Sequence, residues 1–220
     1  MTKVRPPLTI DALCREAAFF AEVESTFPEP TLYGVTDGKA VGTYLEHKFQ
    51  AYLETRYAFT ECNSASGIDF SDLQVDMKVT SVKQPQSSCP FKNPRQKIFG
   101  LGYGLLVFVY KKMDDATTHS STLNIIHTTF VEARRTADYS MTRMILRMLQ
   151  EDANIEDLMA LMADRNLLVD DIEAQKIAQE ILKHPPEQGY LTISNAYQWR
   201  LQYGRALASA GEVDGILKLR

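Results

Sequence analysis

Two carboxylates and one lysine lie close together in a segment rich in β-forming residues. Asp76 and Lys78 are two residues apart, so in a strand their side chains project from the same face. Asp69 lies seven residues before Asp76 and can come alongside if the chain reverses or bulges between Ser71 and Gln74. Carboxylates that face one another repel, so they need raised pKa values or a cation between them.

A hard divalent cation such as Mg2+ suits this set of residues. It binds one or two carboxylates and keeps several waters and positions for phosphate oxygens. A neighbouring ammonium can hold and polarise an attacking water. Asp69, Asp76 and Lys78 are therefore the parts that metal-dependent phosphodiester hydrolysis requires. The alternative is structural, since Asp-x-Lys is a common triplet and on an exposed strand it is a solvated ion pair of little energetic value.

The pattern around the pair predicts a half-buried strand over residues 74–82. Apolar Val75, Met77 and Val79 alternate with polar residues from Gln74 to Thr80. This period of two places the apolar side chains on one face and the charged ones on the other. The polar face is then lined up for use in a site or for contact with solvent.

Charge is distributed unevenly along a chain whose net charge is −4. That sum argues against a protein that coats nucleic acid without specificity. Residues 78–112 nevertheless carry seven basic side chains and no Asp or Glu, which would attract an anionic substrate. Residues 151–180 are strongly acidic instead. The alternative is an uneven surface without functional meaning.

Length and composition are those of a soluble globular protein. A chain of 220 residues with 45% hydrophobic and 24% charged residues fits one domain of ordinary size, with room for an appended helical part. The first residues lack the apolar stretch of a signal peptide, and the longest apolar run, 105–110, is too short to cross a membrane. Three cysteines without CxxC spacing indicate free thiols in the cytoplasm and disfavour a zinc site.

The elements that must position the acidic residues follow from periodicity and capping residues. Thr9 and Asp37 are expected to cap the first two helices, and Asn93 followed by Pro94 a third. Helices are predicted over 9–25, 38–57, 93–101, 135–150, 154–163, 169–182 and 194–209, and strands over 68–72, 74–82, 105–111 and 122–131.

This order of elements and the residues Ile68-Asp69, six intervening residues, then Asp76-Met77-Lys78 resemble the PD-(D/E)XK nuclease superfamily. Ile68 stands where the motif's name has Pro. The segment from Lys83 to Lys97 looks most like type II restriction endonucleases. The resemblance covers roughly residues 38–131. It implies an α/β (α+β) fold with an αβββαβ core, a mixed central sheet flanked by helices, and a helical C-terminal part. We therefore expect a nuclease core over residues 1–135 and a helical region packed on it over residues 136–220.

The resemblance also implies roles for single residues. Asp69, Asp76 and the backbone carbonyl of Met77 would bind Mg2+, and Lys78 would orient or activate the attacking water. Glu46, on the preceding helix, corresponds to a further acidic residue found in many members, although it can equally be an ordinary exposed carboxylate. Asp72 competes with Asp69 for the first position, but Asp suits the turn expected there.

DNA contacts are expected in the basic segment that follows the catalytic strand. Arg and Lys suit guanine edges, Gln and Asn suit adenine, and all of them can hold phosphate. Arg95 is the best single candidate, although the Asn93 segment can equally serve only to cap a helix. The candidate contacts are Lys83, Gln84, Gln86, Ser87, Ser88, Lys92, Asn93, Arg95, Gln96 and Lys97.

Other chemistry is disfavoured. Gly100, Gly102 and Gly104 lack the strand–turn–helix order of a phosphate loop and are better explained as a tight exit from a helix into a strand. The histidines have no partners at metal-binding spacing. The aromatic residues between Tyr190 and Tyr203 fall at helical spacing and indicate core packing more than base reading.

Together these features predict a Mg2+-dependent type II restriction endonuclease that cuts double-stranded DNA. Two cuts from one site per chain suggest a homodimer on a palindromic sequence. The family resemblance also implies a cognate DNA methyltransferase, which would not be a physical partner, and no membrane association is expected. The alternatives are a repair or structure-specific nuclease on the same core, and a DNA-binding or regulatory protein that does not cleave.

Overall fold

The computed structural model describes residues 5–60, 67–88, 93–194 and 200–220, and the chain divides into two compact units. The sheet unit comprises residues 1–86, 104–131 and 209–220. The helical unit comprises residues 87–103 and 132–208. Each unit is built from segments that are distant in sequence. The division expected at residue 135 stays a prediction.

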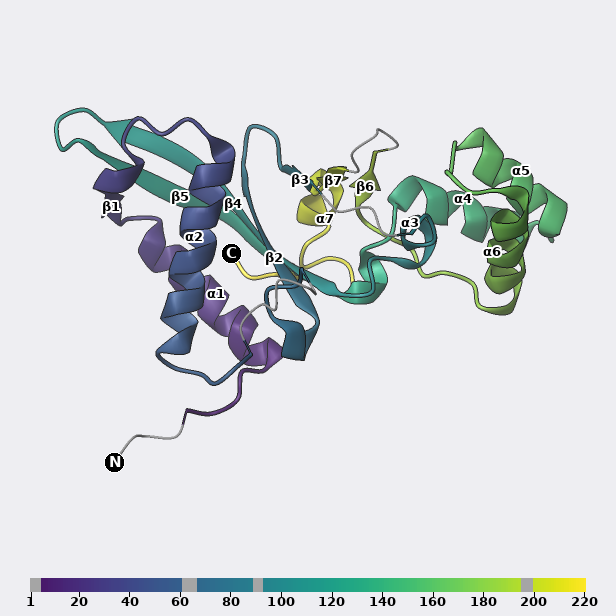
Figure 1. The fold of residues 1–220 in the computed structure, drawn as a ribbon, viewed down its shortest axis with the longest axis horizontal. Coiled ribbons are helices and arrows are strands. Elements are labelled where there is room, and N and C mark those ends of the chain that lie inside the picture. Colours follow the sequence, from purple (N-terminus) through teal and green to yellow (C-terminus); the bar gives the residue numbers. More distant parts are fainter. Residues whose placement is uncertain (1–4, 61–66, 89–92, 195–199) are drawn as a thin grey trace. The chain divides into compact units, whose positions relative to one another are not determined.

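Two capped helices open the sheet unit (Figure 1). Helix α1 spans Ile10–Glu24, and the Thr9 hydroxyl accepts a hydrogen bond from the Ala12 N–H at 3.2 Å. Helix α2 spans Gly38–Glu54, and the Asp37 carboxylate accepts from the Lys39 N–H at 3.0 Å. Each cap satisfies a backbone donor that has no partner inside its helix. The predicted starts of both helices are confirmed.

A mixed sheet forms the centre of this unit. Its strands follow the order β1 (Pro28–Glu29), β5 (Ser120–Val131), β4 (Gly104–Asp115) and β2 (Val75–Ser81), and β8 (Ile216–Lys218) also pairs with β5. Strand β2 runs parallel to β4, whereas the β1–β5, β4–β5 and β5–β8 pairs are antiparallel. Among the described residues β2 is an edge strand, so one side of its backbone is available for other partners.

Helices α1 and α2 pack on one face of this sheet (Figure 1). Phe49 of α2 lies at the centre of the core, with ring centroids 4.9 Å from Phe20 and 5.3 Å from Phe108. Met77 of β2 is fully buried in the same cluster. Because side chains alternate along a strand, this packing directs Asp76 and Lys78 to the opposite face. The expected fold class, a mixed sheet flanked by helices, is confirmed.

The strand predicted over residues 68–72 is wrong. Ser71–Leu73 form a 3-10 turn, η2, and Gln74 takes a left-handed conformation with φ 53°. Phe70 and Val75 close this reversal by exchanging two backbone hydrogen bonds, at 2.9 and 3.2 Å. A bridge of one residue pair therefore replaces the strand, because the chain reverses before a ladder can extend.

The helical unit consists mainly of three helices, α4 (Tyr139–Gln150), α5 (Ile155–Asp164) and α6 (Asp171–Lys183). The side chains of Asp138, Asn154 and Asp170 cap their first turns. Ile145, Leu158 and Ile177 belong to its apolar core. The other elements are short: the turn η3 (Ala133–Arg135) and the helices α3 (Gln96–Phe99) and α7 (Gly204–Ala208). A small sheet follows the order β3 (Gln86–Ser88), β7 (Arg200–Gln202), β6 (Thr192–Ile193). In the sheet unit, Pro30–Leu32 form the turn η1.

The helix predicted over residues 194–209 is confirmed for only part of the described residues. Arg200–Gln202 form a strand that pairs antiparallel with Thr192–Ile193, and only Gly204–Ala208 are helical. Leu201 is buried between exposed Arg200 and Gln202, which is the period of a strand. Residues 195–199, including two of the aromatic residues weighed above, lie outside the described residues. Tyr203 is fully buried, as expected for core packing.

The helix predicted over residues 93–101 is shorter than expected and spans only Gln96–Phe99. It ends at Gly100, whose φ is 89°, and a Cβ there would lie 2.8 Å from the Ala133 carbonyl oxygen. This close approach explains why the helix ends at Gly100. The tight exit from the helix that the sequence predicts at this glycine is confirmed. Across the described residues, no helix has both the length and the apolar character needed to span a membrane.

Candidate active site

Asp76 and Lys78 project together from the edge strand β2, as their spacing predicts. The Lys78 Nζ lies 2.7 Å from Asp76 Oδ2, and the two side chains are 22% and 5% exposed. The alternative of a solvated surface pair is therefore excluded by burial. A buried ion pair of this kind pays a large desolvation cost, so it is weak evidence for a role in stability and better evidence for a functional site.

Asp69 reaches the same place through the reversal at η2. Its Oδ2 accepts a hydrogen bond from the Met77 N–H at 2.8 Å, which fixes the carboxylate against the free edge of β2. Asp72 takes a different role: its Oδ2 accepts from the Thr60 N–H at 2.8 Å, so it braces the turn. Asp69, and not Asp72, is the carboxylate beside Asp76.

Electrostatics in this cluster favour a cation. Burial raises the pKa of Asp76 to about 7, and the hydrogen bond with Asp69 adds to the rise, while Lys78 opposes it. Burial opposes charge on Lys78, but Asp76, Asp69 and Glu46 together raise the pKa of its ammonium. Lys78 is therefore charged at neutral pH. A divalent cation bound beside Asp76 would offset the burial and the repulsion from Asp69 that disfavour its charged form.

Helix α2, which packs on the other face of the sheet, contributes two polar side chains that interact with this cluster. Burial and then the charge of Asp69 raise the pKa of the Glu46 carboxyl, although Lys78 and His47 oppose this. Glu46 is thus half-buried and electrostatically coupled to the cluster. One turn later, Gln50 Nε2 donates to Asp69 Oδ1 at 3.4 Å. The sequence reasoning missed Gln50, although its position four residues after Glu46 was a usable signal.

The donor atoms fit a hard cation such as Mg2+. Asp69 and Asp76 offer carboxylate oxygens. The Met77 N–H points to the free edge of β2, where it donates to Asp69, and in a strand the carbonyl of the same residue points to the same side. Within the described residues, no group of three or more His, Cys, Asp or Glu side chains is arranged as a metal site. Two carboxylates and one carbonyl are the ligands to test, with Glu46 near them.

Other polar residues of the strand have structural partners. The Thr80 hydroxyl donates to the carbonyls of Gln84 and Gln86, at 3.2 and 3.0 Å, and accepts from the Gln86 N–H at 3.1 Å. Thr80 therefore shapes the loop that leaves β2. Lys83 and Gln84 are exposed on this loop.

The remaining candidate DNA contacts lie in the helical unit. Ser87 and Tyr203 hydroxyls are 2.5 Å apart, and Ser88 is exposed. The Asn93 side chain accepts from the Arg95 N–H at 2.8 Å, and Gln96 Nε2 donates to the Leu101 carbonyl at 3.1 Å. Lys92 lies outside the described residues.

Arg95 and Lys97 differ sharply in their surroundings. The Arg95 guanidinium forms two hydrogen bonds with the Glu180 carboxylate and stacks over the Phe99 ring at 4.5 Å. Its side chain is 45% exposed, so it can still reach a ligand. Lys97 is only 5% exposed, and burial lowers the pKa of its ammonium. DNA contacts by these residues stay predictions.

Comparisons with known proteins agree with one another. The family model described as "Type II restriction enzyme NspV" matches residues 7–218. The curated protein of that name from Nostoc sp. (strain ATCC 29411 / PCC 7524) is 64% identical over 210 residues, which cover 96% of this chain and 96% of that protein. No solved structure is significantly similar to the chain. The chain therefore belongs to the NspV family of type II restriction enzymes.

Proposed function

We propose that this protein is a site-specific endonuclease that cuts double-stranded DNA with Mg2+, using a PD-(D/E)XK active site. One observation carries the proposal. Asp69, Asp76 and Lys78, which match the motif of that superfamily, meet at the edge of β2, where Asp76 and Lys78 are 2.7 Å apart. Double-stranded DNA is the substrate in this proposal because the chain belongs to a restriction enzyme family and the similar Nostoc protein is named a restriction enzyme.

Each side chain has a chemical task in this proposal. Asp69 and Asp76 hold the cation with the Met77 carbonyl, and a bound Mg2+ would polarise the scissile phosphate and lower the pKa of a water. Asp69 is held for this by the Met77 N–H and by Gln50. Glu46 faces the same cluster and can hold a metal-bound water.

Lys78 acts as a charged group in this proposal. Its ammonium is stabilised by three carboxylates, so it does not serve as a base at neutral pH. It instead orients the attacking water and offsets the negative charge that builds on the phosphate in the transition state. Its burial makes this interaction stronger than it would be in water.

The assembly follows from the substrate. One cluster of this kind per chain cuts one strand, so we propose a homodimer on a palindromic sequence. We further propose that the enzyme acts in the cytoplasm, where a cognate methyltransferase protects host DNA without binding the enzyme.

The test is digestion of phage DNA under three metal conditions. With Mg2+ we expect discrete fragments with uniform ends, and in EDTA intact DNA. Ca2+ should support binding with little cutting, since its larger and looser shell positions the water poorly. Full cutting in EDTA would overturn the metal mechanism.

The same digest separates the alternatives. Smears or nicks without unique ends would favour a repair or structure-specific nuclease on the same core. DNA that is retarded in a gel but never cut, with Mg2+ or Mn2+, would favour a binding or regulatory protein. Sedimentation of the protein on its mapped cut sequence then tests the homodimer.

A further inference from the structure

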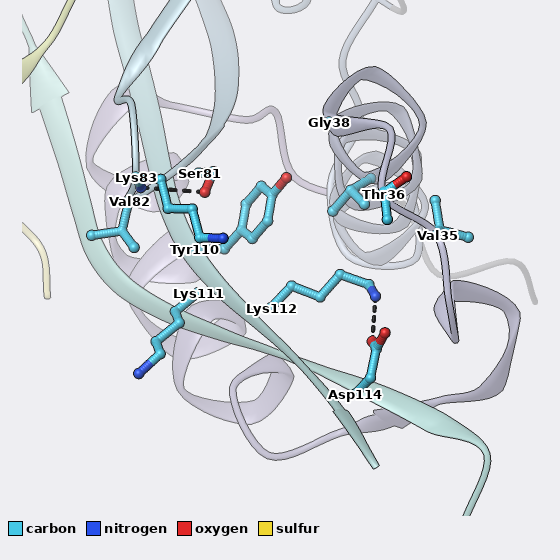
Figure 2. Close-up of a pocket in the computed structure, with 11 residues that line it drawn as sticks. Val35, Thr36, Gly38, Ser81, Val82, Lys83, Tyr110, Lys111, Lys112 and Asp114 are labelled. Carbon is cyan, nitrogen blue, oxygen red and sulfur yellow. Dashed lines mark hydrogen bonds and ion pairs between the residues drawn. The ribbon is translucent and has the colours of Figure 1, made fainter. Parts of the chain in front are cut away.

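A cavity of about 550 Å³ lies in the sheet unit, at the opposite end of β2 from Asp76. Figure 2 shows the side chains around it. They come from the segment before and at the start of α2, from the end of β2 and the loop after it, and from the second half of β4. Apart from Lys83, none of the residues assigned a role so far lines this cavity.

Tyr110 supplies an unusual group to the cavity. The residue is 4% exposed, and its hydroxyl forms no hydrogen bond with any residue that the structure describes. Figure 2 shows this hydroxyl pointing across the cavity towards Thr36 and the first turn of α2. Burial, and then the charge of Asp37, raise the pKa of the hydroxyl, so it stays a donor. The hydroxyl itself is not enclosed by protein, so it can donate a hydrogen bond to a ligand in the cavity.

The charges around the cavity favour an anion. Three lysines line it, Lys83, Lys111 and Lys112, against one carboxylate, Asp114. The Lys112 ammonium is paired with Asp114, whereas Lys83 is exposed and has no ion pair among the described residues. The start of α2 adds the positive end of a helix dipole, although Asp37 caps the Lys39 N–H there and opposes part of that effect.

The position of the cavity suits a second point of contact on the DNA. Lys78 and Ser81 are three residues apart in β2, which at about 3.3 Å per residue is roughly 10 Å along the strand, and Lys83 lies in the turn that follows. That length corresponds to the rise of about three nucleotides in one strand of B-DNA. Lys39 lies two helical turns before Glu46 and so on the same side of α2, near the end of that helix from which Gly38 lines the cavity.

We propose that this cavity binds one backbone phosphate of the duplex away from the cleaved bond, with Lys83 neutralising it and the Tyr110 hydroxyl donating to it. The proposal rests on the proposed function, since it takes DNA as the ligand. It makes Tyr110 and the start of α2 part of the DNA-binding surface, beyond the active site itself. Such a contact positions the duplex without reading its sequence.

The test measures binding of a duplex that contains the mapped cut sequence, in Ca2+ over a series of salt concentrations. Lys83→Gln should weaken binding about tenfold at low salt and reduce the salt slope by about one. Tyr110→Phe removes only the hydroxyl, so it should weaken binding about fivefold with the salt slope unchanged. Lys176→Gln, an exposed lysine of α6, is the matched control and should change neither quantity.

A neutral methylphosphonate placed at one phosphate at a time identifies the contact. At one phosphate outside the cut, the methylphosphonate should weaken binding by the wild type about as much as the Lys83→Gln substitution does. The same methylphosphonate should not weaken binding by the Lys83→Gln variant any further. If both variants bind like Lys176→Gln, or no position shows this coupling, the cavity does not hold a phosphate. A wild type that retards phage DNA in a gel but never cuts it would instead overturn the proposed function, because no cut sequence could then be mapped.

Discussion

The carboxylate of Asp69 accepts a hydrogen bond from the backbone N–H of Met77 at 2.8 Å. This contact joins two parts of the chain that the 3-10 turn η2 separates, and it places Asp69 beside Asp76 at the free edge of β2. Because Met77 lies between Asp76 and Lys78, the same backbone unit fixes all three charged side chains. Three predictions concern this cluster, and two more concern Arg95 and Glu24 elsewhere in the chain.

Lys78 is expected to be essential for cleavage but not for folding. Lys78→Ala removes the only ammonium paired with Asp76 in the described structure, so the cleavage rate at saturating DNA should fall about a hundredfold to a thousandfold. Binding in Ca2+ should stay within a few-fold of wild type. Lys176→Ala is the control, and a Lys78→Ala enzyme that cuts at the control's rate would place the active site elsewhere.

Asp76→Asn is also expected to lose cleavage while DNA binding is kept or strengthened. The substitution removes a buried negative charge that repels phosphate when no cation is bound. Cleavage with Mg2+ should be lost, while affinity for DNA in EDTA should equal or exceed that of the wild type. Gel retardation in EDTA, beside a digest in Mg2+, measures both. Retained cleavage, or clearly weaker binding in EDTA, would contradict a role in holding the cation.

Gln50 is expected to be a positioning residue for Asp69. Its hydrogen bond to Asp69 Oδ1 is long, at 3.4 Å, so the effect of Gln50→Ala should be modest, about three- to tenfold on the cleavage rate. The diagnostic readout is the Mg2+ concentration that gives half-maximal activity, which should rise because Asp69 is less well held. Thr43→Ala, exposed on the same helix, should leave that concentration unchanged. An unchanged Mg2+ requirement in Gln50→Ala would exclude positioning.

Arg95 is expected to exchange Glu180 for DNA. Arg95→Ala should weaken binding by roughly 1–3 kcal/mol if it reads a base, or lower affinity for all sequences alike if it holds a phosphate. Glu180→Gln should tighten binding, since it releases the guanidinium. Thermal unfolding should change little in either variant, because partly exposed ion pairs contribute about 0–1 kcal/mol. Affinities that match the wild type at every salt concentration would place Arg95 outside the interface.

The free energy of unfolding should depend on pH through the ionisation of Glu24. This side chain is 3% exposed, and burial raises the pKa of its carboxyl even though Lys48 lies 2.9 Å away. Because its pKa is higher in the folded state than in the unfolded state, Glu24 stabilises the fold at a pH below its pKa in the unfolded chain, about 4.3. This stabilisation is lost as the pH rises through the pKa of Glu24 in the folded state. Glu24→Gln cannot ionise, so its stability relative to wild type should increase from pH 4 to pH 7.

Urea denaturation at intervals of pH measures this difference. Glu22→Gln, an exposed position on the same helix, should keep a constant offset from wild type. A difference for Glu24→Gln that is flat or falls with pH would contradict the raised pKa.

The helices of the sheet unit were largely determined by the sequence. Thr9 and Asp37 mark the starts of α1 and α2 because a side-chain acceptor beside an apolar period is a local signal, read within four residues. The shared direction of Asp76 and Lys78 was equally local, because a separation of two residues puts side chains on one face of any strand. These parts required no knowledge of distant residues.

The tertiary structure decided what depends on distant partners. Residues 200–202 form a strand because Leu201 is buried and pairs with Ile193, although their local pattern favoured a helix. Lys97 is buried by its neighbours in the folded chain, which its place in a basic segment did not indicate. Sequence pattern carries no information on which segments pair.

The site itself divides in the same way. The sequence determined its chemistry, since Asp69, Asp76 and Lys78 are the residue types that a cation and a phosphate require. The turn at η2, the approach of Gln50 from α2, and the meeting of Tyr110 with the start of α2 were decided only by folding. The physical reason is that residue types and short spacings fix which groups are available. Burial, charge coupling and the closing of a cavity arise from contacts between segments that are tens of residues apart.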